Sequence, residues 1–209
     1  MDTTMKKKEE SSSHGRWGRL AHGISEVTNP LFVACPTLFA VAVAHAPDLL
    51  HAILWWFIAV GGIAVAPFLF VLHGVRRGHY SDHHVSRREQ RLIPLLFGLG
   101  SIGIAFLLLL FLHTSPLLMA TVTAVIVVLL IATIITRFWK ISLHLVGIAG
   151  AVTVCVVVFG PRFLLLAPLV VLVAWARWKV GAHTPLQAVV GSVLAIGVTL
   201  LLFWIWGVL

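Results

Sequence analysis

The sequence predicts an all-α membrane protein, a polytopic bundle of about six to seven transmembrane helices. Of its 209 residues, 60% are hydrophobic and only 11% are charged, whereas soluble domains carry about 25% charged residues. The mean hydropathy is +1.04. The apolar residues also gather in runs of the length that crosses a bilayer, about 20 residues. These observations exclude a soluble enzyme, a secreted disulfide scaffold and a disordered tail.

Seven apolar runs are the predicted spans, and the first and sixth of them are short. Apolar hairpins alternate with short basic loops along this part of the chain. The predicted spans cover residues 30–46, 52–74, 94–113, 117–136, 141–159, 164–176 and 185–208.

The first 29 residues differ sharply from the rest, because they contain KKKEE and SSS but few large apolar residues. We expect residues 1–14 to be disordered and residues 16–29 to form an interfacial helix with Trp17 and Leu20 facing lipid. No apolar core follows the lysines closely, so we expect no cleavable signal peptide at this start. The chain therefore divides into a cytoplasmic tail with its interfacial helix, 1–29, and a transmembrane domain, 30–209.

The basic residues predict the orientation of the bundle. All but one of the 15 Lys and Arg residues lie in the N-terminal segment or after the second, fourth and sixth spans, and the exception is Arg162. Loops rich in Lys and Arg are cytoplasmic. We expect a multi-pass protein of the cell or inner membrane with a cytoplasmic N-terminus, and its net charge of +8 at a membrane face rather than on nucleic acid.

The two cysteines, Cys35 and Cys155, both lie inside apolar runs. Free cysteine behaves there as a small hydrophobic residue. We expect two unpaired thiols and no metal site built on them.

Three polar segments should share the basic membrane face, because each joins the end of an even-numbered span to the start of an odd-numbered one. Ionisable residues near or within spans are costly and therefore functional candidates. The segments are SDHHVSRREQRLIP at 81–94, RFWKISLH at 137–144 and RWKVGAHTPLQ at 177–187.

In the segment at 177–187, Thr184 suits an N-cap and Pro185 the first turn of the last span. His183 then lies just before a helix N-terminus, which favours an anion. Gln187 can reach back to its imidazole, and Arg177 precedes it by six residues. The alternative is ordinary snorkelling of the basic side chains to the interface, with His183 as an incidental interfacial residue.

In the segment at 137–144, Ser142 can cap the fifth span, which places His144 in its first turn. Lys140 lies four residues before His144, so both should point into the same end of the bundle. Gly147 and Gly150 follow and allow a neighbouring helix to approach closely. Lys140 can alternatively be a simple positive-inside anchor.

The segment at 81–94 has three interpretations. Three arginines recur at helical spacing, and a run of guanidinium groups is a natural phosphate clamp. They can instead grip anionic lipid headgroups. The nearby histidines and aspartate can instead bind a divalent metal. The arginines are Arg87, Arg88 and Arg91, and the metal candidates are His79, Asp82, His83 and His84.

Together these motifs resemble the type 2 phosphatidic acid phosphatase superfamily of membrane lipid phosphatases. Its third motif is an Arg, five residues and a His, matched by Arg177 and His183, with Val190-Gly191 following. Its second motif ends in a His, and Lys140-Ile-Ser-Leu-His144 is a degenerate version. Its first motif is a Lys with Arg-Pro downstream, and Arg88-Glu-Gln-Arg91-Leu-Ile-Pro94 matches it loosely.

The resemblance implies a phosphoryl transfer that uses no metal and no cofactor. His183 would be the nucleophile and His144 the general acid. Phosphoryl transfer mainly requires positioning and positive charge around the phosphoryl oxygens. The resemblance assigns that role to Arg177, Lys140, Arg88 and Arg91.

The chain departs from the family pattern at two places. Gln187 stands where the family has an Asp that orients the histidine, although the resulting His-Thr-x-x-Gln resembles the dolichyl diphosphate phosphatase branch. A whole hairpin also separates the first motif from the second, where the family usually has one loop.

We therefore expect a polytopic phosphatase of lipid mono- or diphosphates, polyprenyl or glycerolipid, whose partners are its phosphorylated lipid and the membrane lipids. One alternative is a non-catalytic binder or carrier of lipid phosphates on the same scaffold. Another is a metal-dependent or prenyltransferase-like membrane enzyme that uses Asp82 and His83.

Overall fold

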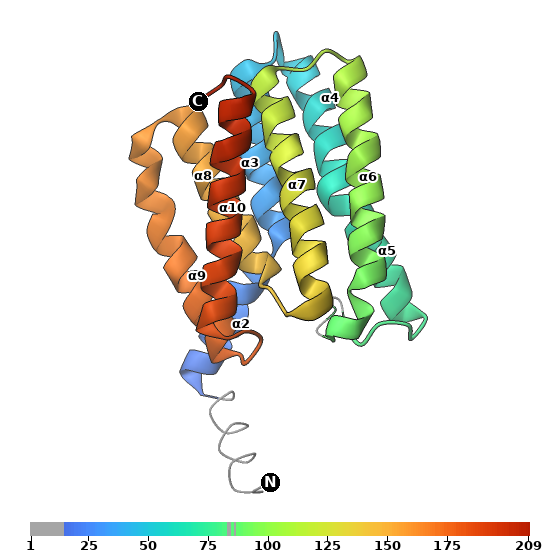
Figure 1. The fold of residues 1–209 in the computed structure, drawn as a ribbon, viewed down its shortest axis with the longest axis vertical. Helices are drawn as coiled ribbons and strands as arrows, with labels where there is room; N and C mark the ends of the chain where they lie inside the picture. Colours follow the sequence, from blue (N-terminus) through green and yellow to red (C-terminus); the bar gives the residue numbers. More distant parts are fainter. Residues whose placement is uncertain (1–14, 83–84, 86) are drawn as a thin grey trace, which may run out of the picture.

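The computed structural model describes residues 15–82, 85 and 87–209, and over these residues the chain is helical without any strand. The predicted all-α class is therefore confirmed. The helices run in chain order through one bundle (Figure 1). They are α2 (Arg16–Val27), α3 (Pro30–His45), α4 (Leu49–Val60), the π-turn η1 (Gly61–Val65), α5 (Ala66–Arg76), the 3₁₀ turn η2 (Arg88–Gln90), α6 (Leu92–Phe111), α7 (Pro116–Phe138), α8 (Leu143–Phe159), the 3₁₀ turn η3 (Pro161–Leu166), α9 (Ala167–Lys179) and α10 (Pro185–Ile205).

Five helical stretches of the described chain are long and apolar enough to cross a membrane. A sixth is possible if α2 and α3, which meet at a bend of 44°, form one span. Counted in this way, the number reaches the lower end of the predicted six to seven spans, and all seven predicted runs are helical. The predicted span that does not qualify is α8, whose 17 residues are at the lower limit of length for a transmembrane helix. The protein is a multi-pass α-helical membrane protein.

The predicted short sixth span is longer than expected, because the 3₁₀ turn η3 extends α9 backwards to Pro161 and makes a continuous stretch of 19 residues. The turn begins after Gly160, whose φ of 98° ends α8. A residue with a side chain would be strained in that left-handed conformation.

The N-terminal helix α2 lies within residues 16–29, where we predict an interfacial helix, and it is amphipathic. Trp17 and Leu20 are exposed, whereas Gly18, Ala21 and Ser25 are buried. The helix packs on α9, where Trp17 meets Trp175 edge-on at 6.3 Å between ring centroids. Residues 1–14, predicted to be disordered, lie outside the described residues.

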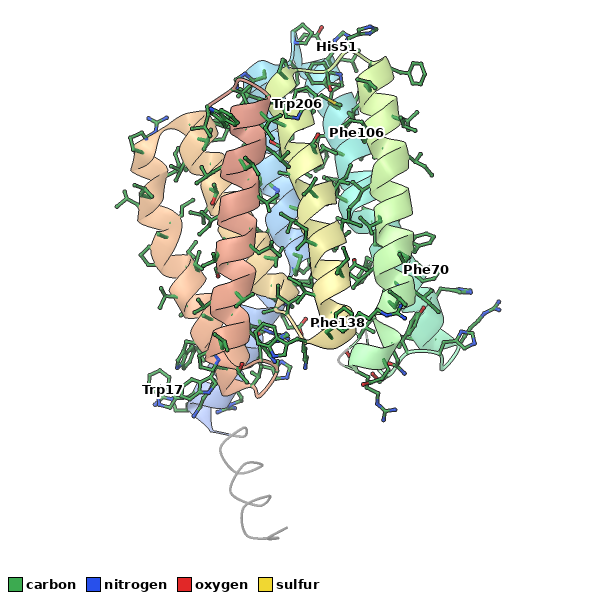
Figure 2. All side chains as sticks on the ribbon, in the orientation of Figure 1. Trp17, His51, Phe70, Phe106, Phe138 and Trp206 are labelled. Carbon is green, nitrogen blue, oxygen red and sulfur yellow. The ribbon has the colours of Figure 1, made fainter. Side chains whose placement is uncertain are left out.

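The three polar loops lie at one end of the bundle together with α2, and the C-terminus lies at the opposite end (Figure 1). Figure 2 shows Trp17 and Phe138 toward the end with the polar loops, and His51 and Trp206 toward the other. Aromatic side chains at both ends are typical of helices that cross a bilayer.

Two clusters of buried apolar residues hold the bundle together. The larger joins α3, α4, α6 and α7 around residues such as Leu38, Trp55 and Leu118. The smaller cluster joins α8, α9 and α10 through Leu145, Val173 and Ala188. These residues lie about one helical turn from the second and third polar loops. The polar residues of those loops are therefore fixed to packed helices. Neither Cys35 nor Cys155 is in a disulfide, as expected.

Candidate functional site

One cavity of about 350 Å³ reaches into the bundle from the basic end. Four ionisable side chains line the part of the cavity at the basic end, here called its mouth, each with only 6–7% of its surface exposed. They come from all three polar segments, which lie far apart in the sequence. These side chains are Arg91, His144, Arg177 and His183.

The loop between α9 and α10 fixes the spacing of Arg177 and His183. The backbone N–H groups of Ala182 and His183 both donate to the Arg177 carbonyl, at 3.0 and 3.2 Å. Gly181 permits this tight turn with a φ of 68°, a conformation that favours glycine. The six-residue spacing thus brings both side chains to the same wall of the cavity.

The N-terminus of α10 follows the predicted pattern, with Thr184 as N-cap and Pro185 in the first turn. The Gln187 N–H donates to Thr184 Oγ1 at 3.3 Å, and the Thr184 N–H donates to Gln187 Oε1 at 3.2 Å. This reciprocal capping box determines which way the Gln187 amide faces, because a backbone N–H requires an oxygen acceptor.

The same Gln187 oxygen lies 3.1 Å from Nδ1 of His183. Since an amide oxygen only accepts, Nδ1 must carry the proton in the neutral imidazole. The lone pair of the ring is then on Nε2. Gln187 therefore selects the tautomer that leaves Nε2 able to act as a nucleophile.

The surroundings keep the His183 imidazole neutral. Its pKa is lowered from 6.5 to about 3, mainly by burial and also by the positive charges of Lys140, Arg91 and Arg177, while the hydrogen bond to Gln187 acts in the opposite direction. A buried imidazole among cations resists protonation.

Arg177 is buried, and its Nε has no hydrogen-bond partner within the described part of the chain. A buried donor of a charged group without an acceptor is unfavourable. An anion in the cavity would supply the acceptor.

The loop between α7 and α8 brings His144 to the same cavity. Its Nε2 lies 3.2 Å from the Ser25 carbonyl of α2, so this nitrogen donates. Ser142 is the N-cap of α8, but its side chain makes no cap hydrogen bond, contrary to expectation. Its hydroxyl is instead buried, with no partner among the described residues.

Small residues bring α10 close to this loop. A Cβ on Gly191 would lie 3.0 Å from the Ser142 carbonyl oxygen. Gly147 faces Pro30 of α3, and Gly150 faces Ala195 of α10. The glycines after His144 therefore lie where neighbouring segments approach, as the sequence predicted.

Arg91 is the arginine of the first segment that enters the site. It precedes α6 and is 6% exposed. Its Nε donates to the Val85 carbonyl at 2.9 Å and its Nη1 to the Ile141 carbonyl at 3.4 Å. It thereby ties the first loop to the second, across the hairpin that separates them in the sequence.

Of the other two arginines of this segment, Arg87 is not among the residues that line the cavity. Arg87 is exposed. The backbone of Arg88 lies in η2, but its side chain lies outside the described residues, so its predicted role in phosphate binding stays a prediction.

Lys140 lies beside the site, although it is not among the residues that line the cavity. Burial lowers its pKa, the charges of Arg91 and Arg177 lower it further, and Asp82 opposes them. These mutual effects indicate that Lys140, Arg91 and Arg177 share one electrostatic environment with His183. The mouth of the cavity therefore has a concentrated positive charge.

The metal hypothesis gains no support from the described residues, which contain no group of three or more His, Cys, Asp or Glu side chains able to hold an ion. His79 is exposed and Asp82 is partly buried. His83 and His84 lie outside the described residues, so half of the candidate ligand set is not placed.

Sequence reasoning missed three backbone carbonyls that position the site, those of Ser25, Val85 and Ile141. No residue type marks a carbonyl as an acceptor, so no sequence signal exists for these contacts. The burial of Ser25 on α2 was also not predicted, because a serine in an amphipathic helix normally faces water.

The sequence matches no protein-family model, and no curated protein or solved structure is significantly similar to it. The fold and the site alone define its class. It is a multi-pass α-helical membrane protein with a basic, histidine-containing cavity at one end.

Proposed function

We propose that the protein is an integral-membrane phosphatase of lipid phosphates or diphosphates that acts through a phosphohistidine intermediate. The observation that carries this proposal is the convergence of His183, His144, Arg177 and Arg91 on the mouth of one cavity. The motifs that resemble the type 2 phosphatidic acid phosphatases supply the assignment of roles.

The charge of the site suits a phosphoryl group. Two buried arginines and Lys140 surround the position beside His183. Guanidinium groups bind phosphate oxygens with several directed donors. The N-terminus of α10 adds backbone N–H groups and a favourable dipole.

The first chemical step uses the lone pair on Nε2 of His183. This nitrogen attacks phosphorus, a P–N bond forms, and the bond between phosphorus and the lipid oxygen breaks. The leaving oxygen takes a proton from the His144 imidazolium. The phosphorylated imidazole becomes positively charged, which strengthens its Nδ1–H hydrogen bond to Gln187.

The second step returns the enzyme to its initial state. Water attacks phosphorus while neutral His144 accepts one of its protons, and the P–N bond breaks. The electron pair returns to Nε2 of His183, and inorganic phosphate leaves. The cations stabilise the charge on the phosphoryl oxygens in both steps.

The apolar part of the cavity favours a lipid over a soluble phosphate. Behind the charged mouth its walls are formed mainly by aliphatic and small side chains. Because the helices cross a membrane, this part of the cavity lies at the depth of hydrocarbon. We further propose that the N-terminus and the basic end face the cytoplasm, following the distribution of Lys and Arg.

One observation favours the alternative, a binder or carrier that performs no chemistry. Nε2 of His144 already donates to the Ser25 carbonyl, which holds that proton away from a leaving group. A protein that only carries lipid phosphates needs the cations and the cavity but not a proton donor.

Phosphate release decides between the two functions. Purified protein in nanodiscs is incubated with a lipid phosphate, with and without EDTA, and an acid-quenched sample is tested for phosphohistidine. We expect turnover that EDTA does not reduce, together with a trapped phosphohistidine. Turnover only with added Mg²⁺ would contradict the histidine mechanism, and binding without turnover would establish the carrier.

A further inference from the structure

The cavity is deep as well as charged. Ile102 of α6 lies eleven residues after Arg91, the N-cap of that helix, and Val154 lies eleven residues after Leu143 on α8. All four residues line the cavity. At 1.5 Å of rise per residue, both helices give a depth of about 16 Å. This depth is about half the thickness of a hydrocarbon core, which is about 30 Å.

A π-turn lies beside this cavity, where α4 continues into α5. Before the turn, α4 packs on α3. After it, α5 packs on α6 and does not pack closely on α3 within the described residues. Figure 1 shows α5 leaving the neighbourhood of α3 toward the basic end. Such π-turns insert an extra residue into a helix and often lie at functional sites.

Contacts with α6 hold the π-turn in place. Gly62 lies against Ser101 and Ala105 with no room for a Cβ, and Ser101 Oγ donates to the Gly62 carbonyl at 2.9 Å. Freed backbone carbonyls within a membrane need such partners. The divergence of α5 from α3 is therefore fixed by specific packing.

The two diverging helices both line the cavity. Ala34 of α3 and Phe68 of α5 are lining residues, and both are only partly buried. Next to them, Phe32 and Leu69 are exposed and face outward. On this side the cavity is lined by two helices, α3 and α5, that do not pack closely on each other among the described residues.

We propose that the hydrocarbon chain of the substrate enters the cavity sideways from the membrane, between α3 and α5, and that the cavity takes one chain. This inference rests on the proposed function. Ligand pockets span roughly 300 to 1,000 Å³, so about 350 Å³ is near the lower limit. Such a volume suits a phosphate with a single alkyl chain better than a diacyl phosphate.

The test compares three phosphates in mixed micelles: dodecyl phosphate, dipalmitoyl phosphatidate and butyl phosphate. The variant Ala34→Trp narrows the opening between α3 and α5. Its matched control is Ala44→Trp, since Ala44 is an exposed residue of the same helix that does not line the cavity. Phosphate release gives kcat/KM for the wild type and each variant with each phosphate.

We expect wild-type protein to prefer dodecyl phosphate to phosphatidate. Ala34→Trp should reduce kcat/KM for dodecyl phosphate by at least about tenfold, and by much more than it reduces kcat/KM for butyl phosphate, whose chain needs no lateral entry. Ala44→Trp should resemble wild type on all three.

The outcomes separate this inference from the proposed function. If wild-type protein hydrolyses none of the phosphates, the proposed function is wrong, and the inference that rests on it is wrong as well. If it hydrolyses them but Ala34→Trp leaves dodecyl phosphate unaffected, or phosphatidate is preferred, only the entry route or the single-chain cavity is wrong. If Ala34→Trp also loses activity on butyl phosphate, the entry route is tested with Phe68→Trp on α5. The same comparison of kcat/KM for dodecyl and butyl phosphate then applies to that variant.

Discussion

Nδ1 of His183 lies 3.1 Å from Oε1 of Gln187, and the backbone N–H of Thr184 donates to the same oxygen. One amide oxygen thus completes a helix cap and orients an imidazole. The family that the motifs resemble uses an Asp at the position of Gln187. The geometry explains how a neutral side chain can fix the tautomer, although it cannot offer the negative charge of a carboxylate.

The first prediction concerns this oxygen. Gln187→Ala should reduce kcat on the order of tenfold to a hundredfold, with substrate binding largely retained, because the tautomer and orientation of His183 are no longer fixed. Gln187→Glu keeps an acceptor oxygen on a side chain of the same length, so its kcat should equal or exceed that of wild type. Its KM should rise, since the carboxylate repels phosphate. Single-turnover phosphate release measures both variants, and an unchanged kcat in Gln187→Ala would contradict the positioning role.

The second prediction separates chemistry from binding. His183→Ala should abolish turnover, by more than roughly a thousandfold, and still bind a lipid phosphate, because Arg177 and the N-terminus of α10 remain. Arg177→Ala should weaken binding on the order of a hundredfold and also lose turnover. Equilibrium binding in nanodiscs and phosphate release are measured for both. Turnover that survives His183→Ala would exclude His183 as the nucleophile.

The third prediction follows from the low pKa of His183, about 3 in the folded protein against 6.5 for the unperturbed group. As the pH falls below 6.5, the unfolded chain binds a proton at this residue and the folded protein does not, so stability is lost. Between pH 7 and 5 the loss should be about 2 kcal/mol. The thermal midpoint of wild-type protein in detergent should therefore fall more steeply over this range than that of His183→Gln. Parallel curves would show that His183 titrates normally.

The fourth prediction concerns the approach of α10 to the second loop. In Gly191→Ala the new Cβ lies 3.0 Å from the Ser142 carbonyl oxygen, so the loop that carries His144 must shift. Overpacking of this kind costs about 1 to 3 kcal/mol, and kcat should fall as His144 moves relative to His183. Gly150→Ala is the control, because its Cβ would meet Ala195 at an ordinary 3.8 Å. Equal midpoints and rates for the two variants would contradict this account.

The sequence by itself determined the class of the protein and the end at which its polar groups gather. Apolar runs specify helices in a membrane because burial in lipid requires each backbone group to be paired within its own segment. The alternation of spans then places the three polar loops on one face. The third segment was predictable in detail, since the contacts between Arg177, His183 and Gln187 are local and capping rules apply to them.

Only the tertiary structure decided which distant residues join that segment. Arg91 enters the cavity because it donates to the Ile141 carbonyl, fifty residues away, and His144 is held by the Ser25 carbonyl of α2. The divergence of α5 from α3 depends on Gly62 packing against α6. These contacts join backbone groups and small residues whose partners are set by how the helices pack, and packing depends on the whole bundle rather than on any local pattern.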